Sequence, residues 1–436
     1  MQITMKNYIS VKASVLLIAV TLALSFIQCK KDFVDPTRAT EAQVLSSSKG
    51  LTGIAVGLQR VHTLGRGSSL YNLVTINGLL TNELFVVNSG NTAEVQLASG
   101  GTAVDGNHTM LTTFWTSNNK VIYDANLVID NAKNLSDQSY ASGLIAYASI
   151  FKALSIGNLS QFWEKVPAGI GTGVTFIDRV DGFKQAIATL NAAQSAISAN
   201  PISATFTSSI PAGIDIPNTI NALKARFYLY SGQLPEALAA ANLVDVTKKS
   251  TFNFDALSLN PLFEVATSTN NVVQPKDSTL GLVSGLTPAT NDARVPFYTS
   301  INPTILPRFR INGFGNAAAT AFPVYLPGEI NLIKAEVYAR QNDTINGKLW
   351  LNNVITKTAD PFNVFANQPA ITAVGSQANL LEQIYRHRCI ELFMSGQKLE
   401  DMRRFGRPTS ERKRNLMPYP LRERDNNSNT PADPTF

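Results

Sequence analysis

Residues 217–246 read PNTINALKARFYLYSGQLPEALAAANLVDV and indicate the fold most clearly. Its first half carries apolar residues at helical spacing, namely Ile220, Leu223, Phe227 and Tyr230. Gly232 then supplies a turn, and Pro235 opens a second helix, because proline lacks the N–H group that has no intrahelical partner in a first turn. The stretch therefore predicts two antiparallel helices joined by a tight turn.

The same stretch also predicts how closely the two helices pack. Ala237 and Ala241 place small side chains on one face of the second helix, which allows a close approach. This pattern of a helix, a glycine turn and a second helix that begins at proline is typical of a tetratricopeptide-like unit. Ala-rich segments at 138–160 and 181–198 add similar units without a regular period. We predict a mostly α protein built on a degenerate helical repeat.

Helical periodicity recurs along the rest of the chain, and strand-like alternation is sparse. We predict helices at 49–64, 119–133, 138–160, 181–198, 217–230, 235–246, 326–340, 346–357 and 379–405. Two segments, 65–113 and 261–325, are rich in Gly, Asn, Thr or Pro and are predicted to be long irregular loops. Long loops in a compact domain are often functional, so any binding site is expected there.

An export segment occupies the amino terminus. Lys6 and Lys12 precede an apolar run over residues 13–27, and Cys29 follows that run closely. The run is shorter than the roughly 20 residues of a membrane-spanning helix, so we predict a cleaved signal peptide over residues 1–28.

Cys29 is the predicted lipidation site, since a cysteine at the end of such a run is the usual acceptor in bacterial lipoproteins. Several acyl chains together hold a protein on a membrane almost permanently. Residues 29–48 would then be the lipidated cysteine and tether, and residues 49–436 a single domain. Gln28 departs from the small residue expected there, and the alternative is a plain secretory signal with an incidental cysteine.

Charge and cysteine content exclude several classes of protein. The chain has 436 residues, a formal charge of +6 and two cysteines. Cys389 is the one cysteine left once Cys29 carries lipid, so no intramolecular disulfide can form. Between residues 382 and 425 there are eleven basic and seven acidic residues. In an exported protein this surplus indicates a solvated or partner-facing surface, and we predict no nucleic-acid partner.

No catalytic or metal motif is present in the sequence. His62, His108 and His387 lie in different segments, and the patterns HExxH, GxSxG and GxxxxGK[ST] are absent. Asp178 and Asp181 are interpreted as capping a helix start. We predict that the protein is not an enzyme and has no cofactor, and we leave a structural calcium ion open.

Residues suited to binding a sugar do occur in the two predicted loops. A protein commonly binds a sugar by placing an aromatic ring against the apolar face of a pyranose, with polar side chains around it. The predicted ligand-binding residues are Tyr71, Asn82, Glu83, Phe85, Asn88, Phe297, Tyr298, Arg308 and Phe309, with Asn91 and Asn302 beside them. The alternative for each aromatic residue is that it fills a small core under its loop.

Taken together, several ordered fragments resemble the SusD/RagB-like outer-membrane nutrient-binding lipoproteins of Bacteroidetes, over nearly the whole chain. These fragments are Cys29 to Asp35, Phe114 to Asn126, Ala146 to Pro167, Tyr325 to Glu336, Leu351 to Val354, Arg388 to Arg404 and Pro418 to Glu423. His387 and Ser395 each replace a glutamate that is usual in the family, which indicates a divergent branch. In the 379–405 helix, Arg388 and Glu391 are expected to pair three residues apart, with His387 packed beside them.

The resemblance implies a SusD-like fold and a cell-surface, lipid-anchored receptor in the outer membrane. Such a receptor captures an oligosaccharide and passes it to a SusC-like TonB-dependent transporter. Two alternatives remain: a RagB-like lipoprotein that binds peptides, and a surface glycosidase.

Overall fold

The computed structural model describes residues 40–268, 271–304, 306 and 308–436. The predicted signal peptide and the predicted lipidation site at Cys29 lie outside these residues. The described chain begins with α2 (Glu41–Leu45), and residues 45–436 form one compact unit.

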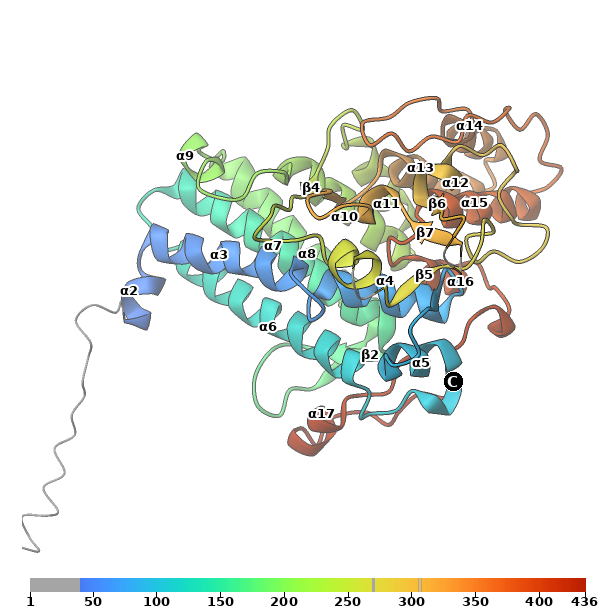
Figure 1. Cartoon of the computed structure of the whole chain (residues 1–436). Helices are drawn as coiled ribbons and strands as arrows, with labels where there is room; N and C mark the ends of the chain where they lie inside the picture. Colours follow the sequence, from blue (N-terminus) through green and yellow to red (C-terminus); the bar gives the residue numbers. More distant parts are fainter. Residues whose placement is uncertain (1–39, 269–270, 305, 307) are drawn as a thin grey trace, which may run out of the picture. The chain divides into compact units, whose positions relative to one another are not determined.

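Helices dominate this unit and pack side by side (Figure 1). A first group consists of α3 (Ser48–Thr63), α6 (Thr109–Ala132), α7 (Gln138–Phe162), α8 (Arg179–Ala199), α10 (Ile216–Tyr230) and α11 (Leu234–Asn242). A second group consists of α13 (Pro327–Arg340), α14 (Thr344–Ile355), α15 (Gln377–Glu391) and α16 (Lys398–Arg404). Contacts between α11 and α13 join the two groups. The predicted helical scaffold is confirmed.

The α10–α11 pair forms as its sequence predicts, except that α11 ends at Asn242 and not at the predicted residue 246. Asp215 caps α10, with its Oδ1 accepting a hydrogen bond from the Asn218 N–H (3.1 Å). Gly232 has a φ of 77°, which favours glycine, and Pro235 lies in the first turn of α11. On its other side α10 packs against α7, where a Cβ on Gly157 would lie 2.4 Å from the Phe227 ring. Only glycine allows the two helices to come this close.

The prediction of one helix over 379–405 is wrong. α15 ends at Glu391, and a turn precedes α16. Met394 and Gly396 have φ values of 60° and 79°, which no α-helix allows. A Cβ at Gly396 would also lie 2.4 Å from Cγ of Leu73, so the turn packs tightly against α4 (Ser69–Leu80).

The prediction of an irregular loop over 65–113 is also wrong for most of its length. This segment contains α4, α5 (Thr92–Ser99), the 3-10 helix η1 (Gly101–Ala103) and the start of α6. Nearly every residue of α4 is buried. Its Asn, Thr and Gly residues are typical of a loop, although they are buried in the folded protein.

The segment 261–325 is closer to its prediction, because its elements are short. They are the π-helix η2 (Leu262–Thr267), β5 (Val273–Pro275), α12 (Arg294–Tyr298), β6 (Thr299–Ile301), β7 (Phe309–Ile311), the 3-10 helix η3 (Gly313–Gly315) and β8 (Phe322–Pro323). The remaining short elements are α9 (Ala204–Thr207), the 3-10 helix η4 (Thr409–Glu411) and α17 (Leu421–Asn426).

The described strands form four antiparallel two-stranded sheets. They pair β1 (Leu84–Val86) with β5, β2 (Lys165–Pro167) with β3 (Phe176–Asp178), β4 (Thr251–Phe252) with β8, and β6 with β7. Gln274 in β5 connects two of these sheets, because its Oε1 accepts a hydrogen bond from the Ile311 N–H in β7 (2.7 Å). The two predicted loop segments are therefore joined through β1, β5 and β7.

Buried ion pairs hold the carboxyl-terminal helices together. Arg388 does not pair with Glu391 as predicted; its Nε lies 2.8 Å from Oδ2 of Asp401 in α16. Glu391 instead contacts Arg294 (Nη1 to Oε2, 3.0 Å) and Lys357 (Nζ to Oε1, 2.7 Å). Each charge thus pairs with a different element, so these pairs fix α15 against its neighbours and do not support α15 alone.

Candidate ligand-binding site

Three of the predicted ligand residues are shielded from solvent. Tyr71 is fully buried and donates its hydroxyl to Oε1 of Glu94 (3.3 Å). Tyr298 is buried and donates its hydroxyl to the Glu391 carbonyl. Glu83 is 1% exposed, and burial raises its pKa to about 7 although the Lys398 ammonium acts in the opposite direction. Direct ligand contact by these three side chains is not supported.

The other predicted residues reach the surface to different degrees. Asn82, Asn88 and Arg308 are exposed, and Phe85 and Phe309 are half-buried. Asn82 has a φ of 61° and donates its amide to the Glu411 carbonyl (3.2 Å), and Asn88 caps the Gly90 N–H (3.0 Å). These polar groups serve local turns as well as facing solvent.

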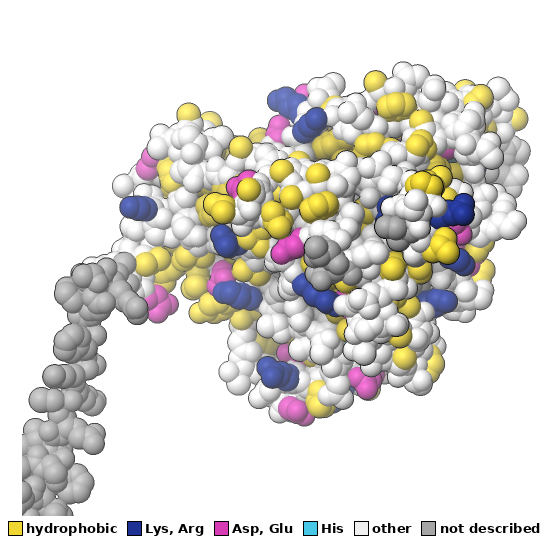
Figure 2. Space-filling model, in the orientation of Figure 1, with side chains coloured by type: hydrophobic (Ala, Val, Ile, Leu, Met, Phe, Trp, Pro, Cys, Tyr) yellow, Lys and Arg dark blue, Asp and Glu magenta, His cyan; other side chains and the backbone are white. Residues whose placement is uncertain are grey.

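The β6–β7 hairpin brings apolar and basic side chains to one surface. Ile301 and Leu306 are 65% and 76% exposed, and Arg308 is also exposed. Figure 2 shows hydrophobic and basic side chains close together over this part of the molecule.

An open pocket lies at the base of this hairpin, and we call it the aromatic pocket. It has a volume of about 500 Å³. Its main lining residues are Lys249, Asn253, Phe297, Asn312, Phe314, Asn316, Thr320 and Phe362. Ligand pockets for small molecules usually measure about 300–1,000 Å³ and combine apolar walls with a few polar groups. The pocket therefore has the size and the lining of a ligand site.

Its aromatic rings support one another in edge-to-face contacts. The Phe314 ring lies 5.2 Å from the Phe297 ring and 6.0 Å from the Phe362 ring. The Lys249 ammonium lies 5.6 Å from the centre of the Phe362 ring. Because Phe297 and Phe314 are only half-buried, they leave apolar ring surface available to a ligand.

The amides of the pocket provide one donor and one acceptor. Asn312 uses its Nδ2 to bond the Pro296 carbonyl (3.2 Å), so its Oδ1 remains an acceptor. Asn316 uses its Oδ1 to accept from the Thr320 hydroxyl (2.6 Å), so its Nδ2 remains a donor. A sugar hydroxyl both donates and accepts, and this pair of groups matches it.

Of the predicted ligand residues, only Phe297 lines the aromatic pocket. Lys249 precedes β4 and Phe362 follows α14, so the pocket joins parts of the chain more than 100 residues apart in sequence. Phe362 is 8% exposed and looks like a core residue from its sequence context. A sequence signal that was missed is the aromatic residue Phe314 between Asn312 and Asn316, inside the predicted loop 261–325.

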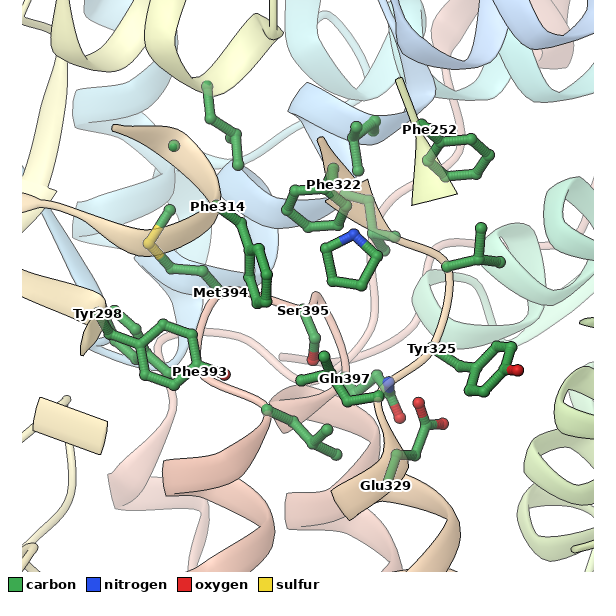
Figure 3. A pocket seen from close by; sticks show the side chains of 18 of the residues that line it. Phe252, Tyr298, Phe314, Phe322, Tyr325, Glu329, Phe393, Met394, Ser395 and Gln397 are labelled. Atoms are coloured by element: carbon green, nitrogen blue, oxygen red, sulfur yellow. The ribbon is translucent and has the colours of Figure 1, made fainter. Parts of the chain in front are cut away.

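A second cavity, shown in Figure 3, shares the lining residues Asn312 and Phe314 with the aromatic pocket. Phe314 and Phe322 line it beside the 392–397 turn, which contributes Gln397, and Glu329 lines it from α13. Its volume is about 60 Å³, room for a few water molecules and far below the size of a sugar site. The buried hydroxyls of Tyr325 and Ser395 have no hydrogen-bond partner among the described residues, so water suits this cavity.

A polar pocket of about 370 Å³ lies where α5 begins. Arg66 contacts both Asn91 (Nη2 to Oδ1, 3.1 Å) and the buried Glu94 (Nη2 to Oε1, 2.5 Å). The Asn91 amide donates to the Asn88 carbonyl (3.0 Å), so the predicted residue Asn88 borders this pocket. Glu94, which sequence reasoning missed, keeps Oε2 without a partner in the described part of the chain.

Two further features of the described residues bear on function. None of their helices combines the length and the apolar character needed to cross a lipid bilayer. Among the same residues, no three His, Cys, Asp or Glu side chains converge to form a metal site.

Comparisons with known proteins identify the fold. No family model matches the sequence, and no curated protein matches it. A SusD superfamily protein from Bacteroides thetaiotaomicron is similar in structure, with a TM-score of 0.69 and 14% identity over 89% of this chain and 100% of that protein.

Two proteins from Bacteroides vulgatus are also similar in structure. One, described as a putative sugar binding protein, has a TM-score of 0.68 and 14% identity over 88% of this chain and 98% of its own. The other, described as a SusD-like carbohydrate binding protein, has a TM-score of 0.66 and 16% identity over 82% and 83%. This chain therefore has the fold of the SusD superfamily.

Proposed function

We propose that this protein is a lipid-anchored receptor of the outer membrane that binds an oligosaccharide in the aromatic pocket. It would pass the sugar to a SusC-like TonB-dependent transporter and perform no chemistry on it. The observation that carries the proposal is the aromatic pocket itself, with half-buried Phe297 and Phe314 beside a free amide donor and acceptor. The carbohydrate-binding descriptions of two structural neighbours support it.

The physical basis is a division of tasks inside the pocket. Ring surface from Phe297 and Phe314 would cover the apolar face of one sugar ring, since aromatic side chains bury large areas at little entropic cost. Asn312 and Asn316 would orient the hydroxyl groups. A volume of about 500 Å³ provides space for a short stretch of glycan, with the exposed hairpin beside it.

Isothermal titration calorimetry against a panel of oligosaccharides tests the binding step. Phe297→Ala should weaken the best glycan about tenfold or more, equivalent to about 1.4 kcal/mol or more. Tyr123→Ala is the matched control, since Tyr123 is 49% exposed and lies on α6 outside the pocket. Unchanged binding by Phe297→Ala, with unchanged circular dichroism, would contradict this site.

The anchor and the partner need separate experiments. Labelling of cells with radioactive palmitate should mark the wild-type protein and leave Cys29→Ala unmarked. Detergent extraction of the wild type should retain a large outer-membrane barrel protein on affinity purification. Recovery without any barrel would argue against delivery to a transporter, even if glycan binding is observed.

A further inference from the structure

A groove between α15 and the segment 366–374 forms a pocket separate from the aromatic pocket, and we call it the histidine groove. Its volume is about 680 Å³. Gln368, Asn379, Gln383, Arg386 and His387 provide its main polar side chains. His387 stands where the resembled family usually has a glutamate. The groove therefore contains a side chain that is unusual for that family.

The tautomer of His387 is fixed by a buried arginine. Its Nδ1 lies 2.9 Å from Nη2 of Arg294. Arginine only donates hydrogen bonds, so Nδ1 accepts and the ring proton must reside on Nε2. Burial, with Arg294 and Arg386 nearby, holds the pKa of His387 well below its usual range. The imidazole is therefore a neutral donor.

His387 lines the groove, and its Nε2–H group has no hydrogen-bond partner among the described residues. The residue is 3% exposed, so its orientation is held by the core. Arg294 is itself held by Asp292 (Nη2 to Oδ2, 2.7 Å) and Glu391 (Nη1 to Oε2, 3.0 Å). An unpartnered donor in so rigid a setting favours a ligand acceptor.

Arg386 adds a charged donor beside it. Its Nε and Nη2 donate to the carbonyls of Leu286 and Thr287, and Nη1 makes no hydrogen bond to the described residues. The acidic groups of the groove are already paired. Asp292 binds Arg294, and Glu382, which is half-exposed, lies 3.7 Å from Arg407.

We infer that the histidine groove binds a carboxylate group, with Arg386 as the charged donor and His387 Nε2–H as the neutral donor. Charge-assisted bonds from arginine to carboxylate are among the strongest hydrogen bonds in proteins. Ile355, Ile371 and Val374 line the rest of the groove, and its lining contains no Phe, Tyr or Trp. The carboxylate can come from an acidic sugar residue or from the end of a peptide. The inference uses no residue of the aromatic pocket and does not rest on the proposed function.

Nuclear magnetic resonance tests the donor first. The chain has three histidines, so histidine-selective ¹⁵N labelling gives few signals, and His387→Phe assigns the one of interest. We expect the Nε2–H tautomer for His387 in the wild-type protein. Observation of the Nδ1–H tautomer would overturn the inference.

Ligand titrations followed at this signal test the site. The probes are glucuronate and N-acetylalanine, each paired with its neutral amide. We expect the acids to shift the His387 signal and the amides to leave it unchanged, and the tighter acid identifies the source of the carboxylate. Equal binding of acid and amide would overturn the inference.

Variants titrated with the same acids by isothermal titration calorimetry, which does not need the His387 signal, then show whether the effect is local. His387→Phe and Arg386→Gln should weaken the acid roughly 10- to 100-fold, the usual effect of losing a hydrogen bond to a charged group. Arg422→Gln removes an exposed positive charge on α17, and Phe297→Ala removes a ring from the aromatic pocket. Neither should change acid binding; an equal loss in Arg422→Gln would overturn the inference. If Arg386→Gln does not fold, His387→Phe and the tautomer measurement still decide it.

Discussion

Replacement of Glu336 by glutamine should destabilise the protein strongly at neutral pH. Glu336 in α13 is fully buried and accepts hydrogen bonds from Arg404 (Nη1 to Oε1, 2.5 Å) and Arg340 (Nε to Oε1, 2.7 Å). Arg388 Nε lies 4.0 Å from its Oε2. Glu336→Gln keeps the shape of the side chain and removes the charge that these three arginines share.

The magnitude follows from the ionisation of this carboxyl group. Burial alone would raise the pKa of Glu336, but the three arginines outweigh burial and lower the pKa from 4.5 to about 2. At about 1.4 kcal/mol per pH unit, this difference contributes about 3 kcal/mol to the free energy of unfolding at pH 7. Removal of one partner from a buried ion pair costs about 3–5 kcal/mol in other proteins, which agrees.

The stabilisation by the ionised Glu336 carboxylate depends on pH. Because the pKa is lower in the folded state, the stabilisation is complete above pH 4.5 and is lost as the pH falls toward 2. The deficit of Glu336→Gln relative to wild type should therefore shrink from about 3 kcal/mol at pH 7 to about 1.5 kcal/mol at pH 3.

Urea unfolding followed by far-ultraviolet circular dichroism at both pH values measures this deficit. Asp130→Asn is the matched control, because the Lys133–Asp130 pair is exposed on the surface. It should change the free energy of unfolding by less than about 1 kcal/mol. The reasoning is refuted if Glu336→Gln behaves like this control, or if its deficit is the same at pH 3 and pH 7.

Two more predictions concern packing. Gly157→Ala should lower the free energy of unfolding by about 1–3 kcal/mol, because its Cβ would lie 2.4 Å from the Phe227 ring. Gly53→Ala should instead raise it by up to about 1 kcal/mol, because nothing lies within 4 Å of its Cβ. Thermal unfolding of the two variants distinguishes these outcomes, and equal shifts would contradict the packing argument. Burial raises the pKa of Cys389 to about 12. In a Cys29→Ser variant, the Cys389 thiol should therefore react with Ellman's reagent at pH 8 only after denaturation. Rapid reaction of the native protein would show that α15 opens.

Local sequence features led to correct predictions of several helices, including α7 and α13, which are buried along most of their length. α3, α7, α10 and α13 begin and end within two residues of their predicted bounds, because caps, prolines and apolar spacing act locally. α4 was missed because its Asn, Thr and Gly residues are typical of a loop, although they are buried in the folded protein. The break between α15 and α16 was missed because Met394, which has no special tendency to turn, adopts a φ of 60°.

The candidate site could be predicted only in part. Phe297 lies in a segment whose composition indicates a loop, and it does line the aromatic pocket. Tyr71 and Tyr298 also lie in the predicted loop segments 65–113 and 261–325, yet both are buried. Burial depends on what packs over a side chain and not on its neighbours in sequence. Lys249 and Phe362 join the pocket from other parts of the chain and carry no local signal.

The helical repeat follows from local sequence features, since the α10–α11 turn needs only Gly232, Pro235 and the spacing of a few apolar residues. Which charges pair and which surfaces stay open depends instead on how distant segments pack together. Arg388 has an acid three residues away, yet it binds Asp401, because a buried charge is stabilised by whichever opposite charge the fold places beside it. The aromatic pocket and the histidine groove arise in the same way, from side chains that distant segments bring together.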